Sequence, residues 1–402
     1  MYVRGIRTLF RFAGFVVSRI RMTSDLIQVN LRRDGRHRLA CPVCGATMAT
    51  SRTKLQTARD LPVGLSMRVL LVYEAIQGYC SACGSWCTIR PPGIDPHARA
   101  TRRLMEFVSR LARHLPLSHI RQVVPVDDAT AFRWDRAILQ QNLPPPNLDG
   151  LRTLLIDEKA VRSHHGYVTL VMNGVTGELL YLAEGKKKES LQGFFDRVNP
   201  EQKASIVAVG MDRAGAYYEV VKEQIPRAAI VFDKFHLIAN YHAVIDEVRR
   251  QEWRKAKGQY KDVIKGQRYN LFRSPENRTV EQTHSLMNLL HMNRNLAICY
   301  ILKDAFKKLW DYHRLKPAAK YFTSWVQYTM VSGVEALRDF GRKIAKFQNE
   351  ILNFCKHSLT TGPLEAFNNT VSRIIHRACG VRNLDYLFLK LRQESLDPVL
   401  PK

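Results

Sequence analysis

Apolar residues in the first 142 positions change their spacing several times, and each change predicts a different element. Residues 1–35 fit a basic amphipathic helix followed by a short strand. The strand is indicated by the alternation of apolar and polar side chains between Leu26 and Leu31. β-like stretches occur within 36–90, and the Pro/Gly-rich segment 90–100 predicts a linker. Residues 101–142 are predicted to be helical, with an apolar face formed by Leu104, Phe107, Val108, Leu111 and Leu115.

The pattern changes after a second breaker at 142–150, which predicts a domain boundary. Strand and helix patterns then follow in the order β-β-β-α-β-α-β, at 151–157, 167–173, 178–184, 188–198, 205–212, 215–224 and 228–233. From 237 to 360 the pattern is helical, and a last helical stretch covers 363–394. We therefore expect a multidomain chain with α+β and α/β parts.

The composition is that of a globular protein with a large excess of positive charge. Of the 402 residues, 46% are hydrophobic and 24% are charged, which excludes a disordered chain, a fibre and a collagen. The net charge of +26 is spread over both halves and favours a polyanionic partner, nucleic acid before an anionic membrane surface. No apolar run reaches about 18 residues, so no transmembrane helix is predicted. Arg11 and Arg19 interrupt the N-terminal apolar stretch, which argues against a signal peptide.

Four of the eight cysteines form two C-x-x-C pairs, Cys41/Cys44 and Cys80/Cys83. Each pair can present two thiolates to one ion, and four thiolates make a closed tetrahedral zinc site. A glycine follows each pair, where a knuckle needs backbone freedom. The plain alternatives are accidental pairs or a redox motif, but two pairs in one basic segment favour structural Zn²⁺ in a reducing compartment. Cys87 is left over.

Residues 101–141 fit a helix-turn-helix. One helix is expected to end near Leu115, a second to span 117–123, and a third to start after Asp127 and Asp128, either of which could cap it. The third helix would present Thr130, Arg133 and Arg136 on one side. A plain three-helix packing unit fits the pattern equally well, and the basic composition and neighbouring cysteine pairs favour DNA binding.

Three aspartates, Asp157, Asp212 and Asp233, each follow an apolar strand. A single such residue is often only a turn or helix cap. Carboxylates repel phosphate, so three of them would oppose DNA binding unless something offsets the repulsion. Divalent cations would do so, because carboxylates can hold two Mg²⁺ that stabilise the attacking and leaving oxygens of a displacement.

A fourth acidic candidate, Glu365, lies near the start of the last helical stretch. It shares a helical face with Asn368 and Asn369, and Arg373 and Arg377 follow where they could reach phosphates. The spacing alone does not separate a ligand from a solvated first-turn glutamate favoured by the helix dipole.

Taken in order, these features resemble the DDE transposases of the ISL-three insertion-sequence group. The shared features are the four-cysteine finger, the helix-turn-helix, the strand order and a glutamate on a late helix. The matching strings are IDE at 156–158, GMDRAGAY at 210–217, FDKFH at 232–236, GPLEAFNN at 362–369 and RACGVRN at 377–383. The resemblance covers nearly the whole chain.

The resemblance implies a transposase that binds transposon ends and target DNA and uses Mg²⁺, which Mn²⁺ could replace, to cleave and transfer strands. It assigns Asp157, Asp212 and Glu365 as catalytic ligands. Asp212 is favoured over Asp233 as the middle carboxylate because it follows the fourth strand. Asp233, His236 and Asn369 would then support the ligands or position DNA. Glu158 is left out, because neighbouring strand residues point to opposite faces.

The implied organisation has four parts. They are a basic helix with a zinc finger (1–95), a helix-turn-helix (100–145), an RNase H-like core (150–236 and 361–395) and an all-helical insertion (237–360). The resemblance implies a homodimer on DNA and a cytoplasmic, nucleoid-associated protein of a bacterium, not a membrane protein. The alternative is a non-catalytic, domesticated or decayed DNA-binding relative. A nuclease acting on RNA has no support, because no RNA-binding motif is visible.

Overall fold

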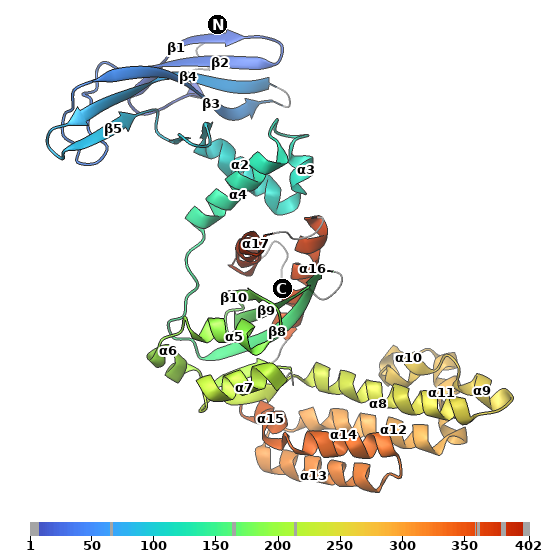
Figure 1. The fold of residues 1–402 in the computed structure, drawn as a ribbon. Helices are drawn as coiled ribbons and strands as arrows, with labels where there is room; N and C mark the ends of the chain where they lie inside the picture. Colours follow the sequence, from blue (N-terminus) through green and yellow to red (C-terminus); the bar gives the residue numbers. More distant parts are fainter. Residues whose placement is uncertain are drawn as a thin grey trace. The chain divides into compact units, whose positions relative to one another are not determined.

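The computed structural model describes residues 8–64, 67–162, 166–212, 215–357, 359, 362–378 and 383–396 (Figure 1). The chain divides into two compact units. Unit 1 comprises Met1–Pro144 and Ile374–Gln393, and unit 2 comprises Pro145–Arg373 and Glu394–Lys402. The first division falls inside the proline-rich breaker at 142–150.

Unit 1 begins with a seven-stranded mixed sheet. Its strands are β1 (Phe15–Met22), β2 (Leu26–Arg33), β3 (Arg52–Val63), β4 (Met67–Cys80), β5 (Ser85–Ile89), β6 (Ile94–Asp95) and β7 (Ala100–Thr101). Their order is β1-β2-β4-β3-β7-β6, with β5 paired to β4. The expected N-terminal helix is wrong for Phe15–Met22, which pairs antiparallel with β2. Residues 1–7 lie outside the described residues.

This sheet has an apolar core of its own, which the sequence pattern did not predict. Val29 and Leu71, which pair in register on β2 and β4, are fully buried, and Ala58, Tyr73 and Ile94 belong to the same cluster. Ile94 lies in the segment expected to be a linker, which instead contains β6 and β7. Short strands such as these are stabilised by their partners more than by local preference.

Three helices follow in unit 1, as the 101–142 pattern predicted. They are α2 (Arg102–His114), α3 (Leu117–Ile120) and α4 (Asp128–Asn142). Asp127 is the N-cap of α4, and its carboxylate accepts a hydrogen bond from the Thr130 backbone N–H at 2.8 Å.

The helix α17 (Leu384–Leu396) also belongs to this unit, up to Gln393. Asp135 of α4 is fully buried and accepts hydrogen bonds from the Ser109 hydroxyl at 2.6 Å and from Lys390 Nζ at 3.1 Å. The Tyr386 hydroxyl also donates to Asp135. A buried carboxylate needs such partners, and they attach α17 to the helices of unit 1.

Unit 2 contains a five-stranded sheet in the order β10-β9-β8-β11-β12. Its strands are β8 (Thr153–Arg162), β9 (Gly166–Asn173), β10 (Leu179–Glu184), β11 (Ala208–Met211) and β12 (Ala229–Phe232). The first three pair antiparallel, whereas β11 is parallel to both β8 and β12. All five strands were predicted from the sequence.

Apolar side chains on one face of this sheet pack against α5 (Lys188–Phe195) and α7 (Gly215–Gln224). Ile156 and Met211 of the sheet and Phe194 and Val220 of the helices belong to this core. The short helix α6 (Pro200–Ser205) precedes β11. Gly210 lies on the other face, where a Cβ atom would come within 2.7 Å of the Leu155 side chain.

A helical block follows β12, as the sequence predicted. It contains α8 (Lys234–Lys255), α9 (Gln259–Ile264), α10 (Arg268–Phe272), η1 (Pro275–Asn277), α11 (Val280–Met292), α12 (Arg294–Lys307), η2 (Lys308–Asp311), α13 (Leu315–Val331), α14 (Glu335–Ala345), α15 (Gln348–Leu352) and η3 (Asn353–Cys355). Tyr241, Phe306, Trp325 and Phe340 form its aromatic centre. Within the described residues, every helix is too short or too polar to cross a membrane.

The final predicted helical stretch consists of two helices, α16 (Gly362–Arg377) and α17. Residues 379–382, in the RACGVRN string, lie outside the described residues. Residues of α16 up to Arg373 belong to unit 2, so Glu365 is part of the same unit as the five-stranded sheet.

Candidate active site and metal centre

The register of the five-stranded sheet places three aspartates at one level. Across β8, β11 and β12 it aligns the core residues Ile156, Met211 and Phe232. Asp157 is the next residue of β8, and Asp212 and Asp233 directly follow β11 and β12. All three side chains line one cavity. Neighbouring strands are about 4.8 Å apart. Asp212 is therefore next to both other aspartates, whereas Asp157 and Asp233 are two strand spacings apart.

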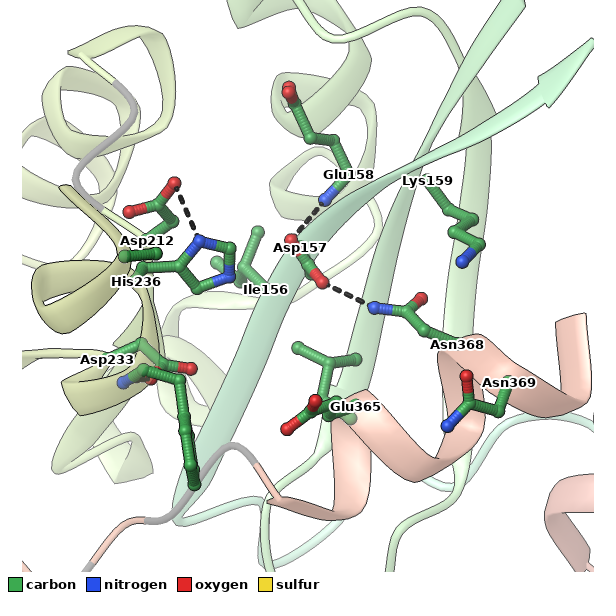
Figure 2. Close-up of a pocket in the computed structure, with 13 residues that line it drawn as sticks. Ile156, Asp157, Glu158, Lys159, Asp212, Asp233, His236, Glu365, Asn368 and Asn369 are labelled. Atoms are coloured by element: carbon green, nitrogen blue, oxygen red, sulfur yellow. Dashed lines mark hydrogen bonds and ion pairs between the residues drawn. The ribbon is translucent and has the colours of Figure 1, made fainter. Parts of the chain in front are cut away.

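Glu365 comes to the same place from the first turn of α16. It lines a cavity of about 490 Å³ together with Asp157, Asp212 and Asp233. Figure 2 shows these four side chains around one space, with Glu158 pointing away from the Asp157 carboxylate. Glu158 also lines the cavity, and its carboxylate forms an ion pair with Lys186 at 3.7 Å. Residues distant in sequence thus form one acidic cavity.

Asp157 is held by two uncharged donors. The Asn368 side-chain amide donates to Asp157 Oδ2 at 2.6 Å, and the Glu158 backbone N–H donates to Oδ1 at 2.8 Å (Figure 2). Burial raises the pKa of the Asp157 carboxyl, and the nearby Asp212 adds to this, whereas both donors and His236 lower it. A bound cation would likewise favour the charged carboxylate.

Asp212 and Asp233 have different surroundings. His236 Nδ1 lies 3.4 Å from Asp212 Oδ2, and both side chains are partly exposed. Asp233 is only 8% exposed and is the N-cap of α8, where its carboxylate accepts a hydrogen bond from the Phe235 backbone N–H at 2.5 Å. Asp233 thus has a structural role in the fold that accounts for an acidic residue at this position.

The donor set of this cavity fits a hard divalent cation. Mg²⁺ prefers oxygen ligands, and the cavity supplies carboxylates from Asp157, Asp212 and Glu365. Asn369, which the sequence favoured as a supporting group, lines the cavity, but Asn368 makes the contact with Asp157. The sequence did indicate that Asn368 lies near Glu365, because it follows three residues later on the same helical face. Spacing alone did not separate the two asparagines.

The four paired cysteines gather in unit 1. The Sγ atoms of Cys41, Cys44, Cys80 and Cys83 all lie within 4.8 Å of one another. The Cys41–Cys83 and Cys44–Cys80 Sγ distances are 3.7 and 3.6 Å. Tetrahedral zinc with bonds of about 2.3 Å requires sulfur atoms about 3.8 Å apart, so the cluster fits zinc. In the described part of the chain, no other set of His, Cys, Asp or Glu ligand atoms comes together in this way.

The backbone around the cysteines also fits a pair of metal-binding knuckles. Gly45 and Gly84 have φ values of +75° and +67°, and each backbone N–H donates to the carbonyl of Cys41 or Cys80 at 2.9 Å. This confirms the conformational role predicted for both glycines. Backbone N–H groups of Cys44 and Val43 lower the pKa of the Cys41 thiol to about 6. The Ala46 backbone N–H likewise lowers the pKa of the Cys44 thiol, but Cys80 and burial raise it, to about 12.

Cys87 lies beside this cluster, with its Sγ 3.6 Å from that of Cys41. It is buried on β5, and burial raises the pKa of its thiol to about 11. Its side chain packs in the apolar cluster around the cysteines, and it is not part of the set of four whose Sγ atoms all lie within 4.8 Å of one another. Sequence spacing gave no indication of this proximity.

The residues expected to contact DNA have different exposures. Thr130 is buried, and its hydroxyl donates to Asp127 Oδ2 at 2.8 Å, so it stabilises the start of α4 and does not face outward as expected. Arg133 is exposed and Arg136 is half-buried. Arg373 is exposed in unit 2, whereas Arg377 belongs to unit 1 and is half-buried.

Comparison with known proteins gives matches along the chain. A family model for transposases of the ISL-three DDE type matches residues 154–391. The transposase for insertion sequence element IS1001 of Bordetella parapertussis is 29% identical over 394 residues, covering 96% of this chain and 97% of the relative. The transposase for IS1557 of Mycobacterium tuberculosis is 25% identical over 398 residues, covering 92% and 86%.

Proposed function

The chain belongs to the ISL-three family of DDE transposases, and on this premise we propose that it is a DNA-transposing enzyme. It binds the terminal inverted repeats of an insertion sequence and catalyses Mg²⁺-dependent strand cleavage and strand transfer. The observation that carries this proposal is the acidic cavity of unit 2. There, Asp157 and Asp212 occupy adjacent parallel strands and Glu365 faces them from α16.

The topology of unit 2 supports an RNase H-like core. Three antiparallel strands are followed by two parallel ones, and helices α5 and α7 cover one face. The aspartates lie on the opposite face, where they line the cavity together with Glu365 of α16. The helical block after β12 is the insertion that separates Asp212 from Glu365 in sequence.

In the proposed mechanism, Asp157, Asp212 and Glu365 would hold the metal ions, which when bound would supply charge stabilisation for the attacking and leaving oxygens of the phosphodiester. Asn368 orients the Asp157 carboxylate by its hydrogen bond. His236, beside Asp212, is placed where it could accept or supply a proton near the reacting oxygens. Asp233 fixes the start of α8, which carries His236.

Unit 1 is proposed to recognise the element's ends. The zinc-bound sheet and the α2–α4 helices would place Arg133 and Arg136 of α4 against DNA, with further phosphate contacts from Arg373 and Arg377. A homodimer would engage the two ends on nucleoid DNA. Binding should weaken steeply with salt, because phosphate contacts release counterions.

The test is cleavage of the element's own terminal DNA by the purified protein, with and without Mg²⁺ or Mn²⁺. Nicking or double-strand cuts at the ends that depend on the metal would support the proposal. Specific end binding without any cleavage would instead favour the non-catalytic alternative.

A further inference from the structure

One basic side chain of β8 lies among the acidic groups of the unit 2 cavity. Lys159 follows Asp157 by two residues, and it is the one lysine or arginine among the described residues that line this cavity. Side chains two residues apart on a strand point to the same face, with their Cα atoms about 7 Å apart. Lys159 therefore places a positive charge on the same side of the sheet as the Asp157 carboxylate.

Lys159 and Lys186 differ in what their ammonium groups contact. Lys186 Nζ lies 3.7 Å from Glu158 Oε1 and 3.9 Å from the centre of the Tyr167 ring, so this charge already has partners. Lys159 is partly buried, and its ammonium has no ion pair or hydrogen bond with any residue that the structure describes. Its three N–H donors thus remain available for an anion that enters the cavity.

The position of Lys159 in the cavity indicates which part of a DNA strand it can reach. Figure 2 shows Lys159 on the same side of Asp157 as Asn368, whereas Asp212 and His236 lie on the other side. The phosphate that reacts belongs with the carboxylates that are proposed to hold the metals. The anion within reach of Lys159 is therefore a neighbouring phosphate of the same strand.

The chemistry of the ammonium group fits such a phosphate. It is a compact point charge with three donors, and hydrogen bonds between charged groups are stronger than neutral ones. A strand that enters this cavity is repelled by the carboxylates that line it, and one lysine at the edge of the cavity offsets part of that repulsion.

Resting on the proposed function, we propose that Lys159 binds a non-bridging oxygen of the phosphate next to the scissile one on the strand that is cut. The contact fixes where the strand lies along β8. Phosphates carry no direct sequence information, so Lys159 positions the strand without reading its bases. It is a positioning residue that neither holds a metal nor moves a proton.

The test couples a protein change to a change in the DNA backbone. Lys159→Met keeps the length of the side chain and removes its charge. It is compared with wild type on the element's terminal DNA, with each phosphate flanking the cut replaced in turn by an uncharged methylphosphonate. Lys159→Met should cleave unmodified DNA about 10- to 100-fold more slowly, the range for losing a hydrogen bond to a charged group. The loss should fall below about twofold on the one substrate that lacks the contacted charge.

Two further variants keep the test decisive. Lys159→Arg retains the charge, so it should cleave unmodified DNA within about tenfold of wild type. Like wild type, it should be slowed by the same single methylphosphonate, and this comparison holds even if Lys159→Met does not fold. Lys316→Met removes an exposed lysine of α13 that is not among the residues lining the cavity, and it should cleave every substrate like wild type.

An equal loss for Lys159→Met on unmodified and all methylphosphonate substrates, or no loss at all, overturns the phosphate contact and leaves the proposed function standing. Wild-type and Lys159→Arg proteins that no flanking methylphosphonate slows would overturn it as well. Absence of metal-dependent cleavage by the wild-type protein would instead overturn the proposed function and this inference with it, so the two failures can be told apart.

Discussion

The cysteine cluster of unit 1 and the acidic cavity of unit 2 each contain a residue of the ligand type, a cysteine or an aspartate, that the proposed metal set leaves out. In the cluster the extra group is Cys87, whose Sγ lies 3.6 Å from that of Cys41. In the cavity it is Asp233, at the same level of the sheet as Asp212. In both sites the extra group has another role in the structure. Cys87 packs as a buried thiol, and Asp233 caps α8.

The two sites differ in how closely their ligand atoms lie together in the absence of metal. The four Sγ atoms are already within 4.8 Å of one another and are held by two knuckles, which suits a closed structural site. The carboxylates line an open cavity of about 490 Å³, which leaves room for substrate oxygens. A structural metal is therefore expected to determine stability, and a catalytic metal is expected to determine rate.

The largest effect is expected from breaking the closed site. Cys80→Ser removes a buried ligand, and metal binding contributes about 10 kcal/mol or more to the folding of small zinc domains. The variant should lose its zinc, and the sheet of unit 1 should unfold while unit 2 stays folded. Metal analysis and protease digestion of the full chain would check this. Cys355→Ala, outside the cluster, is the control and should keep about one equivalent of zinc, whereas a Cys80→Ser protein that keeps its zinc would contradict the assignment.

The next largest effect is expected in the open site. Asp212→Asn removes a charged ligand while keeping the shape, so cleavage should fall about 1,000-fold or more, since several kcal/mol of transition-state stabilisation are lost. DNA binding should stay or tighten, because repulsion of phosphate is relieved. Single-turnover cleavage and a binding titration measure the two quantities.

Asp233→Asn is the matched control for Asp212→Asn. Asparagine caps helices as well as aspartate does, so the fold of α8 should be retained and only the charge is lost. We expect less than about a tenfold reduction of cleavage, because the cap is unchanged and no ligand is removed. If Asp233→Asn abolishes cleavage and Asp212→Asn does not, the middle carboxylate is Asp233.

The sequence predicted the parts of this comparison that depend on local pattern. The strands ending at Asp157, Asp212 and Asp233 are apolar runs followed by an acidic residue, and the knuckles are short motifs with glycine. Local pattern could not show that Met211 pairs with both Ile156 and Phe232, because register depends on partners distant in the chain. That register places Asp212 between Asp157 and Asp233.

The N-terminal sheet was not predicted, and the residues against which α17 packs could not be, for a related reason. The segment Phe15–Met22 carries basic residues among apolar ones, a pattern that suits a surface helix and an edge strand equally well. It forms a strand because it pairs with β2. The C-terminal helix was assigned to the catalytic core by its place in the chain. The buried Asp135, with Lys390 as partner, attaches it to unit 1, and neither residue shows this by spacing.

A smaller effect is expected from Asn368→Ala, which removes the side-chain donor to Asp157. Groups that orient metal ligands typically contribute about 10- to 100-fold, so cleavage should fall by that factor. The hydrogen bond favours the charged carboxylate and lowers its pKa. Without it Asp157 should hold its proton to higher pH, and the pH of half-maximal cleavage should rise.

The control for that variant is Asn369→Ala, on the same helix and lining the same cavity without a hydrogen bond to Asp157 among the described contacts. It should leave the pH profile in place. A fall in rate without any shift of the profile would mean that Asn368 serves the fold and not the carboxylate.

The smallest effect is expected from Cys87→Ala, and it tests whether the cluster uses four thiolates or a changing set of five. The Sγ atoms of Cys41, Cys44, Cys80 and Cys83 all lie within 4.8 Å of one another, and Cys87 does not belong to this set. Cys87→Ala should therefore keep about one equivalent of zinc and lose only about 1 kcal/mol of stability, the cost of a small cavity beside Cys41. The rate of zinc release to a chelator distinguishes the two possibilities more clearly. If Cys87 can replace a ligand, zinc should leave the variant at a different rate, and an unchanged rate assigns the site to Cys41, Cys44, Cys80 and Cys83 alone.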